Sequence, residues 1–243
     1  MDSHGYDHLP GQTIAPPPSD GLNCVHILLG GTWVWLYRPD AVSDRGPDLL
    51  VVLRADTGEV VAQVELDTVG QAAQFVQHPD GSHVMLNVDE GQDGVKLFLV
   101  SLNDGGIDLH SYEWEDRALI DIAPNGQCFM TVDHGRSDFA FHTFPSGEEM
   151  LSLPVEAFSY EYGDEFIDWN GGFLNADFAV IVITGEVNDK EWHQYYKVDL
   201  RTGKSLGRFE AHSSEIDSFQ TLSDDTWIVS DLNGDPVCHR LVV

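Results

Sequence analysis

The sequence is poor in basic residues, and this shortage limits the partners that it can have. Of its 243 residues, 12 are Lys or Arg and 41 are Asp or Glu, which gives a formal net charge of −29. A field of this sign repels nucleic-acid phosphates and anionic membrane surfaces, so we expect neither nucleic acid nor membrane as a partner. The charge favours a cationic small molecule or a basic protein partner, or it serves only as a solubility or habitat adaptation.

Cysteine and long apolar runs are also scarce. The three cysteines, Cys24, Cys128 and Cys238, are odd in number and form no Cys-x-x-Cys motif, which argues against a disulfide framework and a zinc knuckle. No basic segment followed by an apolar one opens the chain, and no apolar run is long enough to span a bilayer. We therefore expect a cytoplasmic monomer with reduced thiols.

No stretch of a dozen residues has the 3.6-residue period of a helix, and alternation with period two dominates. Residues 32–37, 49–53 and 179–184 are short apolar runs typical of strands. Turn motifs separate such runs, for example Pro-Asp-Gly at 79–81 and Pro-Asn-Gly at 124–126. The sequence therefore predicts an all-β protein.

The turns recur at a regular interval, which indicates an internal repeat. The two Pro-x-Gly turns begin at residues 79 and 124, about 45 positions apart, and a second type of turn follows each of them. Four strands in that length are typical of a β-propeller blade. We predict a single propeller, with a two-sheet sandwich as the alternative, and place its five blades at residues 22–67, 70–114, 117–155, 163–212 and 215–243.

The two ends of the chain are expected to meet in the last blade. We expect residues 1–21 to be a polar arm, partly flexible, because the segment is polar and contains three consecutive prolines near its end. The fifth unit stops after its third strand. The arm is therefore predicted to supply the missing fourth strand, near residues 13–14, and to close the ring.

Part of the chain resembles the WD40-type repeat. In residues 209–241, Ala211-His212 stands where that family has Gly-His, and Ile216 and Phe219 occupy its inner-strand apolar positions. The Asp-x-x-Thr-Gly-like turns also resemble those of YVTN-type bacterial propellers, although the chain has neither a Trp-Asp nor a Gly-His dipeptide. The resemblance implies a propeller and leaves its function open, because propellers include enzymes, ligand-binding proteins and scaffolds.

One face of such a propeller carries the hairpins between the second and third strands of each blade, and here these hairpins are acidic. Residues 89–94, 133–138, 186–193 and 231–235 are the four examples. We predict that Asp133 and His134 belong to a ligand-binding face. The alternative is that Asp, Asn and Gly occur there only because tight hairpins need them.

A long connection between the third and fourth blades adds aromatic residues to the same face. It contains Tyr160, Tyr162 and Asp164, and we group these with Trp192 and His193 as an aromatic, acidic ligand-binding lip. Such a lip suits a cation, through cation–π and carboxylate contacts. The alternative is that the tyrosines pack over the blade edges.

Three aspartates on predicted innermost strands suggest an enzyme as the alternative function. Asp121, Asp168 and Asp217 would line the central channel, an arrangement that resembles five-bladed glycoside hydrolases. Under this interpretation they are the catalytic residues of a hydrolase or lyase that acts on a small metabolite. The alternative is that these carboxylates hydrogen-bond backbone groups and tie blades together.

The sequence predicts no cofactor and no metal ligands. The eleven histidines form no His-x-His or His-Glu-x-x-His motif, and no Gly-x-Ser-x-Gly or Gly-x-Gly-x-x-Gly occurs. The alternative is calcium at Asp231, Asn233 and Asp235, in a loop that lacks the distal glutamate of an EF-hand. The favoured function is a non-catalytic propeller that presents an acidic face to a protein partner or a cationic small molecule.

Overall fold

The computed structural model describes residues 24–27, 31–104, 106–114, 116–213, 218–231 and 233–241, with backbone only for 24–27. Strands dominate these ranges, and the short 3₁₀ helices among them are η1 (Ala41–Ser43), η2 (Gly91–Asp93) and η3 (Val155–Phe158). No helix within the described ranges is long and apolar enough to cross a membrane.

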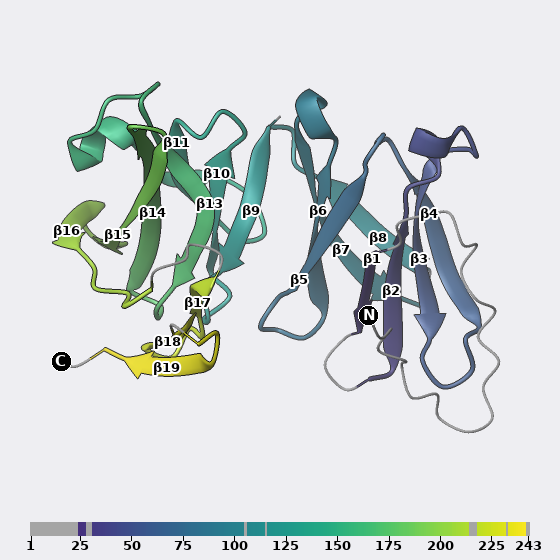
Figure 1. The fold of residues 1–243 in the computed structure, drawn as a ribbon. Coiled ribbons are helices and arrows are strands. Elements are labelled where there is room, and N and C mark those ends of the chain that lie inside the picture. Colours follow the sequence, from purple (N-terminus) through teal and green to yellow (C-terminus); the bar gives the residue numbers. More distant parts are fainter. Residues whose placement is uncertain are drawn as a thin grey trace.

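The strands form five separate antiparallel sheets, one for each predicted blade, and we number the blades in chain order (Figure 1). Blade 1 contains β1 (Cys24–Ile27), β2 (Trp33–Arg38), β3 (Asp48–Arg54) and β4 (Val60–Leu66). Blade 2 contains β5 (Ala72–Gln77), β6 (His83–Asp89), β7 (Val95–Asn103) and β8 (Gly106–Ser111).

The remaining blades repeat the same order of neighbouring strands. Blade 3 contains β9 (Arg117–Ile122), β10 (Cys128–Asp133), β11 (Asp138–Thr143) and β12 (Glu149–Pro154). Blade 4 contains β13 (Glu165–Phe173), β14 (Phe178–Val187), β15 (Lys190–Asp199) and β16 (Lys204–Arg208). Blade 5 contains β17 (Gln220–Thr221), β18 (Thr226–Ser230) and β19 (Pro236–Arg240), and the arm predicted to complete it lies outside the described residues.

The two Pro-x-Gly turns connect the first and second strands of blades 2 and 3, as predicted. In blade 2 the Gly81 amide donates to the His78 carbonyl at 3.0 Å, and in blade 3 the Gly126 amide donates to the Ala123 carbonyl at 2.8 Å. Both glycines have a positive φ, +73° and +67°, which a residue with a side chain adopts only with strain. The same backbone requirement explains why the motif repeats in the sequence.

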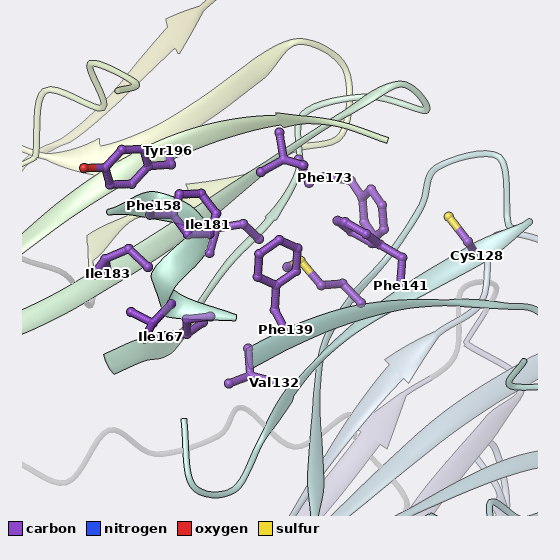
Figure 2. Close-up of a cluster of buried hydrophobic side chains, with 14 of the residues drawn as sticks. Cys128, Val132, Phe139, Phe141, Phe158, Ile167, Phe173, Ile181, Ile183 and Tyr196 are labelled. Carbon is purple, nitrogen blue, oxygen red and sulfur yellow. The ribbon is translucent and has the colours of Figure 1, made fainter. Parts of the chain in front are cut away.

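The hydrophobic core consists of clusters between neighbouring blades. One cluster fills the space between β10 and β11 of blade 3 and the strands of blade 4, where Phe139, Phe141, Phe173 and Ile181 converge (Figure 2). These four side chains are almost completely buried. Further clusters join blades 1 and 2, blades 2 and 3, and blades 4 and 5. Each blade therefore depends on its neighbour for burial of its apolar faces.

A fully buried carboxylate fastens blade 1 to the connection that leads into blade 2. Asp48 accepts hydrogen bonds from the hydroxyls of Tyr37 and Thr68, both at 2.7 Å, and from the amides of Gly70 and Ala41, both at 2.9 Å. Burial alone would raise the pKa of Asp48, but these hydrogen bonds hold it below its ordinary value, so the carboxylate is ionised. The Asp48 carboxylate thus holds two side-chain hydroxyls and two backbone amides in place.

Candidate functional site

A cavity of about 280 Å³ lies on the hairpin side of blade 4, with one wall from blade 3. Its chemistry is mainly acidic and aromatic. The lining residues are Arg136, Asp164, Phe166, Asp168, Thr184, Gly185, Glu186, Glu191, Trp192 and His193. Of the residues that the sequence assigns to the ligand-binding lip, the structure therefore brings Asp164, Trp192 and His193 together.

Arg136 lies in the β10–β11 hairpin of blade 3, and its guanidinium reaches across to blade 4. It donates to the Asp168 carboxylate and to the Thr184 hydroxyl, both at 2.7 Å, and to the Ile167 carbonyl at 3.1 Å. Asp168 lies where the β13–β14 register is interrupted, in a bulge that turns its side chain toward the arginine. The charge of Asp168 is therefore neutralised by Arg136.

The other three carboxylates of the cavity are accessible to a ligand. Asp164, Glu186 and Glu191 are exposed, and none of them has an ion-pair partner within the described part of the chain. Trp192 lies opposite Gly185 in the β14–β15 ladder, and a Cβ at Gly185 would lie 2.6 Å from its indole ring. The indole thus packs on the backbone of Gly185, on the same hairpin as Glu186 and Glu191.

The two tyrosines of the lip have structural contacts rather than places in the cavity lining. Tyr160 packs on Trp192 with ring centroids 5.4 Å apart, and its hydroxyl lies 2.8 Å from that of Tyr196. Burial and the Tyr196 hydroxyl raise the pKa of Tyr160 to about 12, so it is neutral at physiological pH. Tyr162 is exposed and donates to the Gly135 carbonyl at 3.2 Å. Tyr160 therefore supports Trp192 from behind.

Asp133 and His134 lie near two other cavities. Asp133 borders a cavity of about 460 Å³, and its Oδ1 accepts hydrogen bonds from the amides of Ser137 and Asp138, which shapes the β10–β11 hairpin. His134 borders a cavity of about 220 Å³ and lies near Trp169. The acidic face predicted from the sequence is thus divided among separate cavities.

Asp121 occupies a junction of three blades. From β9 it accepts hydrogen bonds from the amide of Phe173 in blade 4 at 2.8 Å and from the hydroxyl of Thr221 in blade 5 at 3.5 Å. Burial raises the pKa of the Asp121 carboxyl to about 6, against the opposing effect of these hydrogen bonds. Asp217, the third predicted channel aspartate, lies outside the described residues.

The raised pKa of Asp121 predicts a pH-dependent penalty on stability. Because its folded-state pKa of about 6 exceeds the ordinary value of 3.8, ionisation costs more in the folded protein. The penalty is absent below pH 4 and develops as the pH rises through 6. We therefore expect the difference in unfolding free energy, Asp121→Asn minus wild type, to increase by about 2 kcal/mol when the pH is raised from 4 to 7.5. Urea unfolding across this range measures the gain, with the exposed Asp108→Asn as a charge-matched control. A constant difference across the range would contradict the prediction.

The loop at residues 231–235, the predicted alternative site for calcium, is stabilised by hydrogen bonds to its own backbone amides. The Asp231 carboxylate accepts hydrogen bonds from the amides of Asp235 at 3.0 Å and Asn233 at 2.8 Å. These bonds lower the pKa of Asp231. The geometry is that of an Asx turn in a hairpin, which accounts for the residue types without an ion. Calcium binding at Asp231, Asn233 and Asp235 stays a prediction.

Comparison with known proteins identifies the fold. No protein-family model and no curated protein sequence matches the chain. Among solved structures, the dihydro-heme d1 dehydrogenase NirN is similar with a TM-score of 0.56 at 12% identity, over 90% of this chain and 46% of that one. Hydrazine synthase of Kuenenia stuttgartiensis is similar with a TM-score of 0.52 at 13% identity, over 97% of this chain and 62% of that one. The Dos1 propeller is similar with a TM-score of 0.50 at 14% identity, over 87% of this chain and 58% of that one.

The fold is a β-propeller. This confirms the predicted all-β architecture and the resemblance to propeller repeats. The chain spans less than two thirds of the length of these similar structures, and identities this low carry the fold alone. The function must therefore be argued from the propeller's own residues.

The sequence did not single out the residue that shapes the cavity. Arg136 lies 32 positions from Asp168 and 48 from Thr184, so no local pattern connects them. The sequence did contain a signal, since Arg136 is the one Lys or Arg in segment 133–138, which begins and ends with aspartate. Glu186 and Glu191 belong to an acidic hairpin that the sequence did identify, but their place beside Trp192 depends on the β14–β15 register.

Proposed function

We propose that this propeller is a non-catalytic binding protein whose cavity beside blade 4 takes a cationic group. The observation that carries the proposal is the rim of three exposed carboxylates, Asp164, Glu186 and Glu191, around the indole of Trp192. Carboxylates attract a cation over a distance, and an indole face stabilises it on contact. A net charge of −29 adds to this attraction.

The size of the cavity limits its occupant. About 280 Å³ is at the lower end of the volumes of small-molecule sites. It fits a small organic amine or a single Lys or Arg side chain of a partner protein. Arg136 and Asp168 neutralise each other at one wall, so the carboxylates of the rim, rather than Asp168, provide the net charge that the ligand meets.

Titration calorimetry with a short lysine- and arginine-rich peptide tests this proposal. The same peptide with acetylated lysines and citrulline in place of arginine is the uncharged control ligand. The charged peptide should bind and the uncharged one should not. Affinity should fall with added salt because exposed charges are screened.

Variants then locate the site. We expect Glu186→Gln combined with Glu191→Gln to weaken binding at least tenfold, and Trp192→Ala to weaken it about tenfold. Glu65→Gln combined with Asp108→Asn changes the net charge equally on blades 1 and 2 and should weaken binding less than threefold. Equal losses of affinity in the two double variants would contradict a local site. They would indicate that the peptide is attracted only by the overall negative charge of the protein.

The enzyme alternative rests on one observation, the raised pKa of Asp121, since such shifts are common among catalytic acids and bases. A hydrolase or lyase using Asp121 and Asp168 would lose turnover in Asp121→Asn and Asp168→Asn while keeping its melting temperature. The hydrogen bonds of Asp121 and the ion pair of Asp168 support a structural role instead. A fall of several degrees in the melting temperatures of both variants would favour that structural role.

A further inference from the structure

Two histidines and an aspartate gather at the β5–β6 turn of blade 2, on a different blade from the cation cavity. A ring nitrogen of His78, a carboxylate oxygen of Asp80 and a ring nitrogen of His83 all lie within 4.8 Å of one another. Asp80 Oδ2 is 3.0 Å from His78 Nδ1 and 2.7 Å from His83 Nδ1. The carboxylate oxygen thus lies between two imidazole nitrogens.

The hydrogen bonds of His78 define which of its nitrogens carries a proton. Its Nε2 lies 2.9 Å from the Gly126 carbonyl oxygen, and since a carbonyl only accepts, Nε2 is the donor. Its Nδ1 accepts the backbone amide of Asp80 at 3.2 Å, which requires a lone pair on Nδ1. That lone pair also faces Asp80 Oδ2 at 3.0 Å, so two acceptors meet with no hydrogen between them.

The backbone of the turn holds Asp80 in this position. Its Oδ1 accepts the amides of Ser82 at 2.8 Å and His83 at 3.0 Å, which leaves Oδ2 directed at the two imidazoles. A cation shared by Oδ2 and the two nitrogens would remove the conflict between acceptors, and so would protonation of His78 at both nitrogens. Either would take the Nδ1 lone pair from the Asp80 amide.

We propose that His78, Asp80 and His83 bind one divalent transition-metal ion of the zinc type. Two imidazole nitrogens and one carboxylate oxygen are ordinary zinc ligands, and three protein ligands leave a fourth position for water. Tetrahedral zinc separates its ligand atoms by about 3.3 Å, close to the 3.0 and 2.7 Å between Asp80 Oδ2 and the Nδ1 atoms of His78 and His83. The two imidazoles offer nitrogens within 4.8 Å of each other, so the side chains must rotate to close the site. The Asp80 and His83 side chains are 36% and 34% exposed, which gives the ion a path from solvent.

The surroundings of His78 are those of a metal ligand fixed by its neighbours. Its ring is buried and stacks on Phe144 of blade 3 with centroids 3.8 Å apart. Its Nε2–H donates to Gly126 in the corresponding turn of blade 3, a contact that orients the ring and leaves the lone pair of the ring on Nδ1. A bound ion would therefore connect the exposed turn of blade 2 to the body of blade 3.

Zinc titration of the full chain is the first test. Calorimetry should show one site that Asp80→Asn or His83→Gln weakens at least tenfold, while His110→Gln, an exposed histidine on β8, changes its affinity less than twofold. Zinc at about 100 times its dissociation constant should raise the wild-type melting temperature by about 5–10 °C. Asp80→Asn is expected to fold, because the corresponding position of the blade 3 turn is Asn125, whose side chain accepts the Gln127 amide in the same way.

NMR of the imidazole nitrogens distinguishes zinc binding at His78 Nδ1 from protonation of the same atom. Zinc should shift the Nδ1 resonances of His78 and His83 while the Nε2–H of His78 persists. Zinc affinity that is equal in wild type, Asp80→Asn and His83→Gln would overturn the proposal, because the ion would then bind other histidines. A zinc-insensitive His78 Nδ1 resonance that only titrates with pH would overturn it in favour of the doubly protonated ring.

Discussion

Asp48→Ala should lower the free energy of unfolding by about 4 kcal/mol, and the melting temperature by about 10 °C. The substitution removes the acceptor of four hydrogen bonds in a fully buried position. The hydroxyls of Tyr37 and Thr68 and the amides of Gly70 and Ala41 would then lose this partner. Each buried donor left without an acceptor costs about 1–3 kcal/mol, partly offset by removal of a desolvated charge.

Chemical denaturation of Asp48→Ala beside Asp67→Ala measures this effect. Asp67 is exposed and lies in the connection that Asp48 fastens, so it shares the neighbourhood without the hydrogen bonds. The control should change the free energy of unfolding by less than about 0.5 kcal/mol. Similar losses in the two variants would show that the Asp48 hydrogen bonds do not stabilise the join between blades 1 and 2.

Gly172→Ala should cost about 3 kcal/mol at the junction of blades 3, 4 and 5. A Cβ at this position would lie 2.8 Å from Asp121 Oδ2 and would also overlap the Thr221 hydroxyl. The backbone has φ +151°, a conformation that residues with a side chain rarely adopt. Backbone strain and overpacking thus add to each other, each at about 1–3 kcal/mol.

Gly46→Ala separates these two contributions. Gly46 has φ +131°, and a Cβ there would meet nothing within 4 Å, so the variant carries backbone strain without overpacking. Thermal unfolding should place Gly172→Ala at least 3 °C below Gly46→Ala. Equal melting temperatures would mean that Asp121 and Thr221 move aside at little cost.

Local patterns in the sequence were enough to predict the five sheets. Each blade is a meander of consecutive strands, so its hairpins follow from turns such as those at 79–81 and 124–126. Because a positive φ in these turns demands glycine, the repeat remains visible even without a Trp-Asp dipeptide. The described residues of the fifth sheet form three strands, and its predicted completion by the N-terminal arm stays a prediction.

Contacts between blades could not be predicted in the same way. Tyr160 meets Tyr196 across 36 positions and Asp121 meets Phe173 across 52, distances at which no periodicity links two residues. His78 and His83 match no standard metal motif, and their approach to Asp80 depends on the backbone of the turn and the ring of Phe144. Side-chain partners were therefore missed where packing between repeats, or the backbone geometry of a single turn, selects them.

The route of Arg136 also bears on how such a protein can evolve. Its guanidinium leaves one repeat and completes a cavity whose other walls belong to the next. Copying a single repeat would duplicate only part of the cavity, and inserting a repeat between blades 3 and 4 would separate the arginine from Asp168. The heritable unit of this site is therefore a pair of adjacent repeats, and gene rearrangements that keep the pair intact are the ones that should conserve it.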